Sequence, residues 1–185
     1  CGVGRNALYL ASVAGTVYGV DYSKVAVQRS TNAAEEAGLD NVTFAVADAV
    51  ADLGVEPRQF DFAVDSFTNT SISGEQRRRA FTRNIYEALR PGGLILVRAI
   101  SHLDEFEQQL MHDFPGPDPN SSIWPRDGKF QKNFNLSELL DMYIQFEPVE
   151  ARKQHKQATK MNHTFNETNW WVVHEKVGDA PEVKA

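Results

Sequence analysis

The chain opens with a glycine-rich segment, Cys1-Gly2-Val3-Gly4, and Asp21 follows seventeen residues after the last of these glycines. Two glycines one residue apart allow a sharp turn and a close approach to a ligand, because neither carries a Cβ. Asn6 begins a predicted helix whose first-turn N–H groups favour an anionic group. Asp21 offers carboxylate oxygens to both hydroxyls of a ribose. Together these residues predict a nucleotide-binding site.

Length and composition indicate one globular domain over residues 1–185. The chain contains 42% apolar and 24% charged residues, and its net charge of −6 argues against a polyanionic partner. Cys1 is the sole cysteine, which excludes an internal disulfide framework and multi-cysteine zinc sites. We therefore expect a cytoplasmic protein without a metal centre. The sequence has no apolar run near the roughly 20 residues of a membrane span, so we expect no membrane association.

Alternating patterns predict a series of strands and helices with short connections. Glycine and N-cap signals bound most of them, with Ser23 as the N-cap of one helix and Ser73 as that of another. The expected strands cover residues 16–21, 42–47, 60–66 and 94–97, and the expected helices cover about 5–13, 23–37 and 74–89. This rhythm predicts a parallel sheet with helices on both faces.

The pattern changes after Ile100. Residues 102–112 can form a helix, but the proline-rich residues 114–119 cannot continue it, and no regular period returns before Asn135. A capped helix is expected from Asn135, followed by strands near 147–155 and 170–174 that form an antiparallel hairpin with a long polar loop.

Four separated motifs make the chain resemble a class I S-adenosylmethionine (SAM)-dependent methyltransferase over nearly its whole length. Cys1-Gly2-Val3-Gly4 resembles the end of the glycine-rich first motif of that family, and Leu89-Arg90-Pro91-Gly92-Gly93 resembles the turn before its fifth strand. The resemblance implies an α/β, Rossmann-like, doubly wound and mostly parallel sheet with a C-terminal antiparallel hairpin. The strand that usually precedes the first motif is missing, so we expect the domain to be incomplete at its N-terminus.

The acidic residues at the expected strand ends, with the glycine segment, imply contacts to SAM. Asp21 matches the ribose-binding acid, Asp48-Ala49 matches the pair that contacts adenine, and Asp65-Ser66 lies at the strand tip near the methionine moiety. The predicted cofactor contacts are Cys1, Gly2, Gly4, Asn6, Asp21, Tyr22, Asp48, Ala49, Asp65 and Ser66.

Two alternatives to a methyltransferase use the same residues. Gly2-x-Gly4-x-x-Ala7 with Asp21 also satisfies the fingerprint of an NAD-dependent oxidoreductase. Asp48, the Arg-Pro-Gly-Gly turn and the late hairpin favour the methyltransferase instead. A non-catalytic, SAM-binding regulatory domain is the second alternative.

Methyl transfer from SAM is an in-line displacement, so the enzyme mainly has to align the reactants, which can supply about 7–11 kcal/mol of the barrier. His102 follows the fifth strand at the ligand-facing edge and is the candidate general base. The alternative is a surface histidine that caps the next helix.

The sequence predicts a small-molecule acceptor without identifying it. Asp65-Ser66-Phe67 departs from the signature of enzymes that methylate nucleobase amines or glutamine amides. Residues 113–134, which include Trp124 and Phe130, lie where this family places substrate-covering insertions; alternatively, these aromatic rings only anchor a loop. Two basic clusters are interpreted as solvated faces, so nucleic acid is disfavoured, and the oligomeric state is not indicated. They are Arg77, Arg78, Arg79 and Arg83, and Arg152, Lys153, Lys156 and Lys160.

Overall fold

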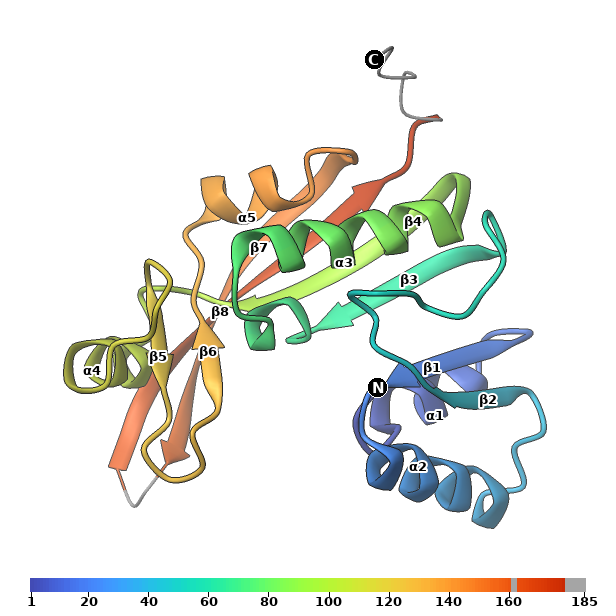
Figure 1. Ribbon diagram of the computed structural model, residues 1–185, viewed down its shortest axis with the longest axis horizontal. Coiled ribbons are helices and arrows are strands. Elements are labelled where there is room, and N and C mark those ends of the chain that lie inside the picture. The colour runs from blue at the N-terminus through green and yellow to red at the C-terminus, as the bar shows by residue number, and fades with distance from the viewer. Residues whose placement is uncertain (161–162, 179–185) are drawn as a thin grey trace. The chain divides into compact units, whose positions relative to one another are not determined.

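The computed structural model describes residues 1–160 and 163–178 (Figure 1). The chain forms two compact units, residues 1–55 and residues 56–185, and each is described by itself. That the whole chain is a single domain stays a prediction. Within the described residues, no helix is long and apolar enough to cross a membrane.

The first unit is a two-stranded parallel sheet with two helices packed on it. The strands pair in register from Val17 opposite Val42 to Asp21 opposite Val46. The elements are α1 (Arg5–Ala11), β1 (Val17–Asp21), α2 (Lys24–Glu36) and β2 (Val42–Val46). Ser23 caps α2 as predicted, because its Oγ accepts the Ala26 N–H at 3.3 Å.

Two glycines allow close packing in the first unit. Gly4 has φ +83° at the N-cap of α1, and a Cβ there would lie 2.7 Å from the Cβ of Ser30 on α2. At Gly19 on β1, a Cβ would lie 2.6 Å from the Phe44 ring. A side chain at either position would therefore push α2 or Phe44 out of place.

The second unit is a four-stranded sheet in the order β3-β4-β8-β7. β3 and β4 are parallel, whereas β8 is antiparallel to both β4 and β7, which confirms the predicted α/β fold and C-terminal hairpin. The main elements are β3 (Phe60–Ser66), η1 (Asn69–Ser71), α3 (Glu75–Ala88), β4 (Leu89–Ile100), α4 (Glu105–Asp113), α5 (Leu136–Met142), β7 (Glu147–Lys160) and β8 (His163–Glu175).

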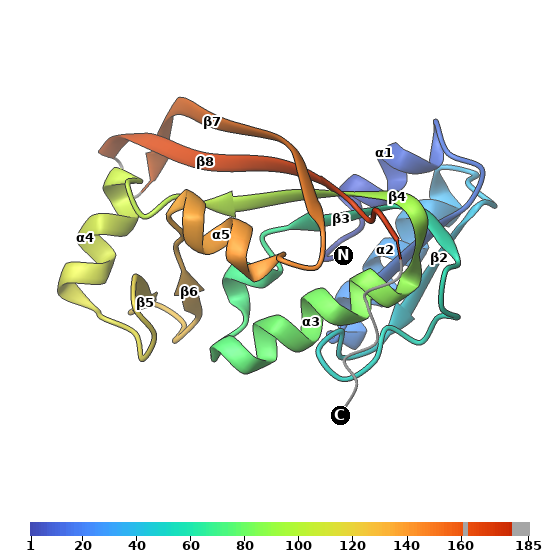
Figure 2. The ribbon, with the colours of Figure 1, turned by 90° about the horizontal axis from the view of Figure 1, so that it is seen from above.

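Helices α3 and α5 lie on the same side of this sheet (Figure 2). Ile95 and Val97 of β4 and Val172 of β8 are fully buried, whereas Phe62 and Leu94, which pair across β3 and β4, are 42% and 36% exposed. Because successive side chains of a strand point to opposite faces, the sheet buries one face more completely than the other.

Two sequence predictions for the second unit were wrong in extent. Residues 114–134 are not a structureless loop but contain a hairpin of β5 (Ser121–Ile123) and β6 (Phe130–Lys132). The predicted polar loop near 156–169 is mostly strand, because β7 and β8 continue to pair as far as Lys160 and His163. Main-chain hydrogen bonds stabilise this ribbon although its sequence lacks an alternating apolar pattern.

Helix boundaries also differ locally from the predictions. Gly74, with φ +88°, precedes α3 in place of the predicted cap Ser73, and its N–H donates to Asp118 at 2.9 Å. The Arg90–Gly93 turn is a bulge inside β4, where the pairing shifts from Phe60–Leu89 to Phe62–Leu94.

Candidate cofactor-binding and acceptor-activating residues

The glycine segment of the first unit is tied to the end of β1. The Gly2 N–H donates to Asp21 Oδ2 at 2.7 Å, and the Ser23 N–H donates to Asp21 Oδ1 at 2.9 Å. Gly2 has φ +58°, and no atom lies within 4 Å of the position that a Cβ would take. The turn therefore keeps open space beside its backbone at the point where Asp21 holds it.

The surroundings of Asp21 favour its charged form. Burial raises the pKa of this carboxyl, but the hydrogen bonds from the N–H groups of Ser23 and Gly2 help to lower it below its ordinary value. A carboxylate has about four lone-pair positions. Two backbone donors therefore leave Asp21 with acceptor capacity for a diol.

The ends of β1 and β2 lie side by side. The Ala47 N–H donates to the Asp21 carbonyl at 3.0 Å, so Asp48 follows on the neighbouring strand at the same edge. Asp48 Oδ1 accepts the Val50 N–H at 3.0 Å, a turn contact that shapes the segment containing Ala49.

Most of the other predicted contacts of the first unit are accessible, whereas Gly4 is buried against Ser30 of α2. Cys1, Asn6 and Tyr22 are exposed, Tyr22 to 82%. This unit thus brings together the glycine turn, Asp21 and the Asp48 turn. The assignment of these residues to a cofactor stays a prediction.

The side chains of Asp65 and Ser66, at the end of β3, lie on opposite faces of the sheet. Asp65 pairs with Val97, and Val97 with Val172, on the face beneath α5, whereas Ser66 pairs with Arg98 and points to the opposite face. The Asp65 side chain is 1% exposed. Sequence reasoning treated the two residues as one contact point, although a strand cannot present adjacent side chains on one face.

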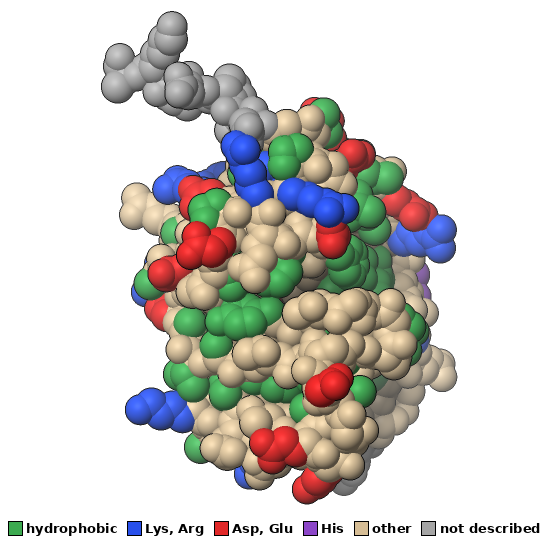
Figure 3. Space-filling view, turned by 90° about the vertical axis from the view of Figure 1, so that its right-hand side faces the viewer, with side chains coloured by type: hydrophobic (Ala, Val, Ile, Leu, Met, Phe, Trp, Pro, Cys, Tyr) green, Lys and Arg blue, Asp and Glu red, His purple; other side chains and the backbone are tan. Residues whose placement is uncertain are grey.

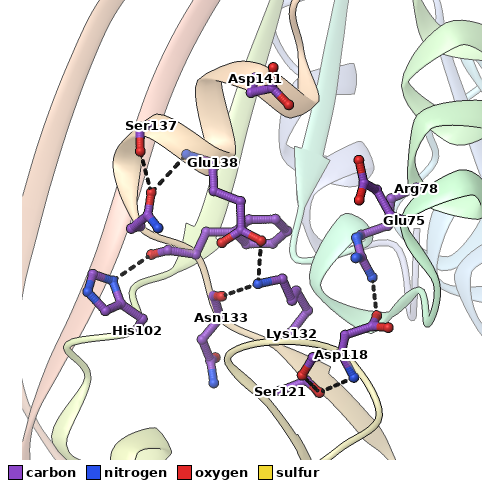
Figure 4. Close-up of polar contacts among 12 residues, drawn as sticks. Glu75, Arg78, His102, Asp118, Ser121, Lys132, Asn133, Ser137, Glu138 and Asp141 are labelled. Carbon is purple, nitrogen blue, oxygen red and sulfur yellow. Dashed lines mark hydrogen bonds and ion pairs between the residues drawn. The ribbon is translucent and has the colours of Figure 1, made fainter.

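His102 is held by a backbone carbonyl. Its Nδ1 lies 3.2 Å from the Phe134 oxygen (Figure 4). The same oxygen also accepts the Trp170 indole N–H at 2.9 Å. Because a carbonyl can only accept, this contact favours, for the neutral ring, the tautomer with the proton on Nδ1 and the lone pair on Nε2. This tautomer is the one that can act as a base through Nε2.

The alternative role of His102 as a helix cap is wrong. Asp104 caps α4, because its Oδ1 accepts the Glu107 N–H at 3.0 Å. Its Oδ2 accepts the Thr168 N–H at 2.8 Å, which also joins the start of α4 to β8. His102 is thus free of the capping function that sequence reasoning assigned to it as the alternative.

Two buried ion pairs anchor the segment over residues 113–134 (Figure 4). Arg78, 3% exposed, contacts Asp118 at 2.6 Å, and the fully buried Lys132 ammonium contacts Glu138 at 2.7 Å. Burial lowers the pKa of Lys132, which Glu138 partly offsets. Sequence reasoning missed Lys132 and Glu138, and their spacing of six residues, from β6 to α5, contains no local signal for a pair.

Most members of the two basic clusters are exposed, as predicted for solvated faces, but Arg78 and Arg79 of the first cluster are engaged within the protein. Arg78 is buried, and Arg79 is bonded to Glu75 and Asp141. In the second cluster, Lys156 contacts Glu167 at 3.1 Å, and the side chain of Lys160 lies outside the described part of the chain. On the face shown in Figure 3, basic and acidic side chains are interspersed.

The chain belongs to the methyltransferase domain family, whose match covers residues 1–93, half of the sequence. The family and the fold confirm the resemblance to class I SAM-dependent methyltransferases. A SAM-dependent methyltransferase from Methanosarcina mazei superimposes with a TM-score of 0.81 at 24% identity, over 96% of this chain and 89% of that one.

Two curated relatives are also methyltransferases by name. The 2-heptyl-1-hydroxyquinolin-4(1H)-one methyltransferase of Mycobacteroides abscessus is 34% identical over 121 residues, 65% of this chain and 50% of the relative. The EEF1A lysine methyltransferase 2 of Danio rerio is 28% identical over 121 residues, 60% of this chain and 50% of the relative. The chain thus spans about half the length of the curated relatives it matches.

Proposed function

We propose that the protein transfers a methyl group from SAM to a small-molecule acceptor in the cytoplasm. The observation that carries this proposal is the joined glycine turn and Asp21 carboxylate in a member of the methyltransferase domain family. The residues fit the cofactor. Gly2 leaves open space beside its backbone, and Asp21 retains acceptor capacity that suits ribose hydroxyls.

The proposal gives each predicted residue a role. Gly2 allows close approach of the backbone to the cofactor, Gly4 lets the same turn pack against α2, Asp21 binds the ribose, and the Asp48 turn contacts the adenine. When bound, SAM supplies an electrophilic methyl group. His102 Nε2 removes the proton from the acceptor atom, while the Phe134 carbonyl keeps the proton of the ring on Nδ1.

The choice of a small molecule over a protein acceptor follows the better-matching relative. The name of the Mycobacteroides abscessus protein specifies a hydroxyquinolone, and that protein has the higher identity, 34% against 28%. An acceptor with an ionisable hydroxyl also suits a histidine base, because its proton must leave before or during methyl transfer.

Calorimetric titration of the full-length protein with SAM, S-adenosylhomocysteine and NAD tests the cofactor assignment. We expect both sulfur compounds to bind and NAD not to bind. Asp21→Ala should weaken SAM binding about tenfold or more, because hydrogen bonds to charged groups are worth about 1.5–3 kcal/mol. Asp40→Ala, an exposed carboxylate before β2, is the matched control and should bind like the wild type.

Each alternative function has its own outcome. Binding of NAD alone would return the glycine turn to the dinucleotide fingerprint. Binding of SAM without product in a screen of hydroxylated and amine acceptors would support a non-catalytic regulatory domain. Methylation of a lysine peptide but of no small molecule would overturn the acceptor class.

A further inference from the structure

A buried hydrogen-bond network surrounds Asp65 at the end of β3. The Tyr143 hydroxyl donates to Asp65 Oδ2 at 2.5 Å, and the N–H groups of Thr68 and Asn69 donate to Oδ1 at 2.8 and 3.3 Å. The Asn69 side-chain amide donates to the Tyr143 hydroxyl at 3.2 Å. Both carboxylate oxygens are therefore engaged within the protein.

This network is sealed from solvent by β8 and the end of α5. Asp65 and Asn69 are each 1% exposed, and Tyr143 is 0% exposed. The His174 ring of β8 stacks on Tyr143 with centroids 5.3 Å apart. A ligand could reach the Asp65 carboxylate only by displacing Tyr143.

The segment that the network holds has a strained conformation. Phe67, a non-glycine residue, has φ +68°. Its N–H donates to the Arg98 carbonyl at 3.0 Å, and its own carbonyl accepts the Thr70 hydroxyl at 2.7 Å. The Arg98 guanidinium lies 4.5 Å from the centre of the Phe67 ring. Because Phe67 directly follows Ser66, the direction of the Ser66 side chain depends on this segment.

We propose that Asp65 and Tyr143 are positioning residues that clamp residues 67–71, and that Asp65 does not itself contact the cofactor. The proposal rests on the proposed function and removes one of its predicted contacts. The burial of the network carries it, because Asp65 is 1% exposed and both of its carboxylate oxygens already accept hydrogen bonds within the protein.

The titratable groups that face Asp65 are Tyr143 from α5 and, behind it, His174 from β8. Burial raises the pKa of Asp65, although Tyr143 and the N–H groups of Asn69 and Thr68 partly offset it. Burial, with the charge of Asp65, raises the pKa of Tyr143 further, so the phenol keeps its donor proton. Burial lowers the pKa of His174 to about 4, so this ring is neutral at pH 7.

Hydrogen exchange of the Thr68 and Asn69 amides in the protein without cofactor tests the clamp independently of methyl transfer. Tyr143→Phe leaves a buried carboxylate oxygen without its donor, so exchange should accelerate about tenfold or more. Tyr86→Phe is the matched control. It also removes a phenol hydroxyl from the second unit, but one that donates to the Gly178 carbonyl. Unchanged exchange in a folded Tyr143→Phe variant would overturn the clamp.

Titration with SAM separates positioning from direct contact. Asp65→Asn should keep SAM affinity within about threefold, because the amide can still accept from the main chain and donate to Tyr143. Ser66→Ala should lose about fivefold, one hydrogen bond, with unchanged exchange. If Asp65→Asn loses more affinity than Ser66→Ala, Asp65 contacts the cofactor and the proposal is wrong.

The exchange experiment tests the clamp, and the titration tests the proposed function, so one can be contradicted without the other. A wild-type protein that binds no SAM would contradict the proposed function and the predicted Ser66 contact. Slow exchange at Thr68 and Asn69 that Tyr143→Phe accelerates would still support the clamp. If Tyr143→Phe does not fold, an Asp65→Ala variant that folds with unchanged exchange at these amides would overturn the clamp.

Discussion

Two aspartates stand at the ends of parallel strands, and their surroundings differ. Asp21 of the first unit has a partly exposed side chain, and backbone donors help to lower its pKa. Asp65 of the second unit is sealed beneath Tyr143, and burial raises its pKa. An aspartate at the end of a parallel strand is thus accessible in the first unit, whereas in the second unit it belongs to a buried hydrogen-bond network.

The difference extends to other polar groups. The first unit presents Gly2, Asp21 and Tyr22 where a ligand can reach them, whereas the second unit encloses Arg78 and Lys132. An enclosed charge must find its partner inside the protein, so its removal should cost more stability than removal of an accessible group.

The largest expected effect is at Lys132. Lys132→Ala leaves Glu138 partly buried without its cation, which should destabilise the protein by about 3–5 kcal/mol. Arg79→Ala removes a half-exposed pair with Asp141 and should cost about 1 kcal/mol or less. Urea unfolding of the two variants measures the contrast, and equal losses would contradict it.

Two glycines of the first unit allow a similar comparison between a packed position and an open one. Gly4→Ala combines a positive φ with a Cβ 2.7 Å from Ser30, and should cost about 2–4 kcal/mol. Gly2→Ala has the positive φ but open space, and should cost about 1 kcal/mol while weakening SAM binding. Thermal unfolding with and without SAM checks both, and a Gly2→Ala variant with unchanged SAM affinity would argue against its role.

The role of His102 predicts a loss of activity without a loss of binding. His102→Gln removes the Nε2 base, so kcat should fall about 10²-fold or more while SAM affinity is unchanged. Steady-state rates with an acceptor from the screen measure it. His112→Gln, an exposed histidine on α4, serves as the control. Wild-type rates in His102→Gln would exclude the base.

The smallest expected change in the free energy of unfolding tests most directly how the surroundings of the two aspartates differ. Asp21 has a lowered pKa, so its stabilisation is present above the ordinary value of 3.8 and is lost as pH falls through the folded pKa. Asp21→Asn should therefore cost about 0.5–1 kcal/mol at pH 7, a value already reduced for its partial exposure.

The pKa of Asp65 is shifted in the opposite direction, so its contribution to stability depends on pH in the opposite way. Its pKa is raised, so its stabilisation is present below 3.8 and is lost as pH rises through the folded pKa. Asp65→Asn should therefore be as stable as the wild type or more stable at pH 7, by about 1 kcal/mol, and this gain should shrink at pH 4. Urea unfolding at both pH values measures the two variants, and destabilisation in both at pH 7 would remove the contrast.

Local signals in the sequence predicted most helices and strands. Ser23 and Asn135 cap their helices as predicted, because an N-cap acts within three residues. The βαβ rhythm was also predicted, whereas the predicted Arg90–Gly93 turn is a bulge within β4. The β5–β6 hairpin and the length of β7 and β8 were not predicted, because their stability comes from strand pairing rather than from an apolar period.

The sequence by itself therefore determined the α/β class, the family and the strand ends where ligand contacts are expected. Only the tertiary structure decided which of these residues is accessible. Asp65 is sealed by Tyr143, 78 positions away, and the His102 tautomer depends on the Phe134 carbonyl, 32 positions away. Burial and hydrogen-bond partners of this kind arise when distant segments pack together, and no short sequence pattern carries them.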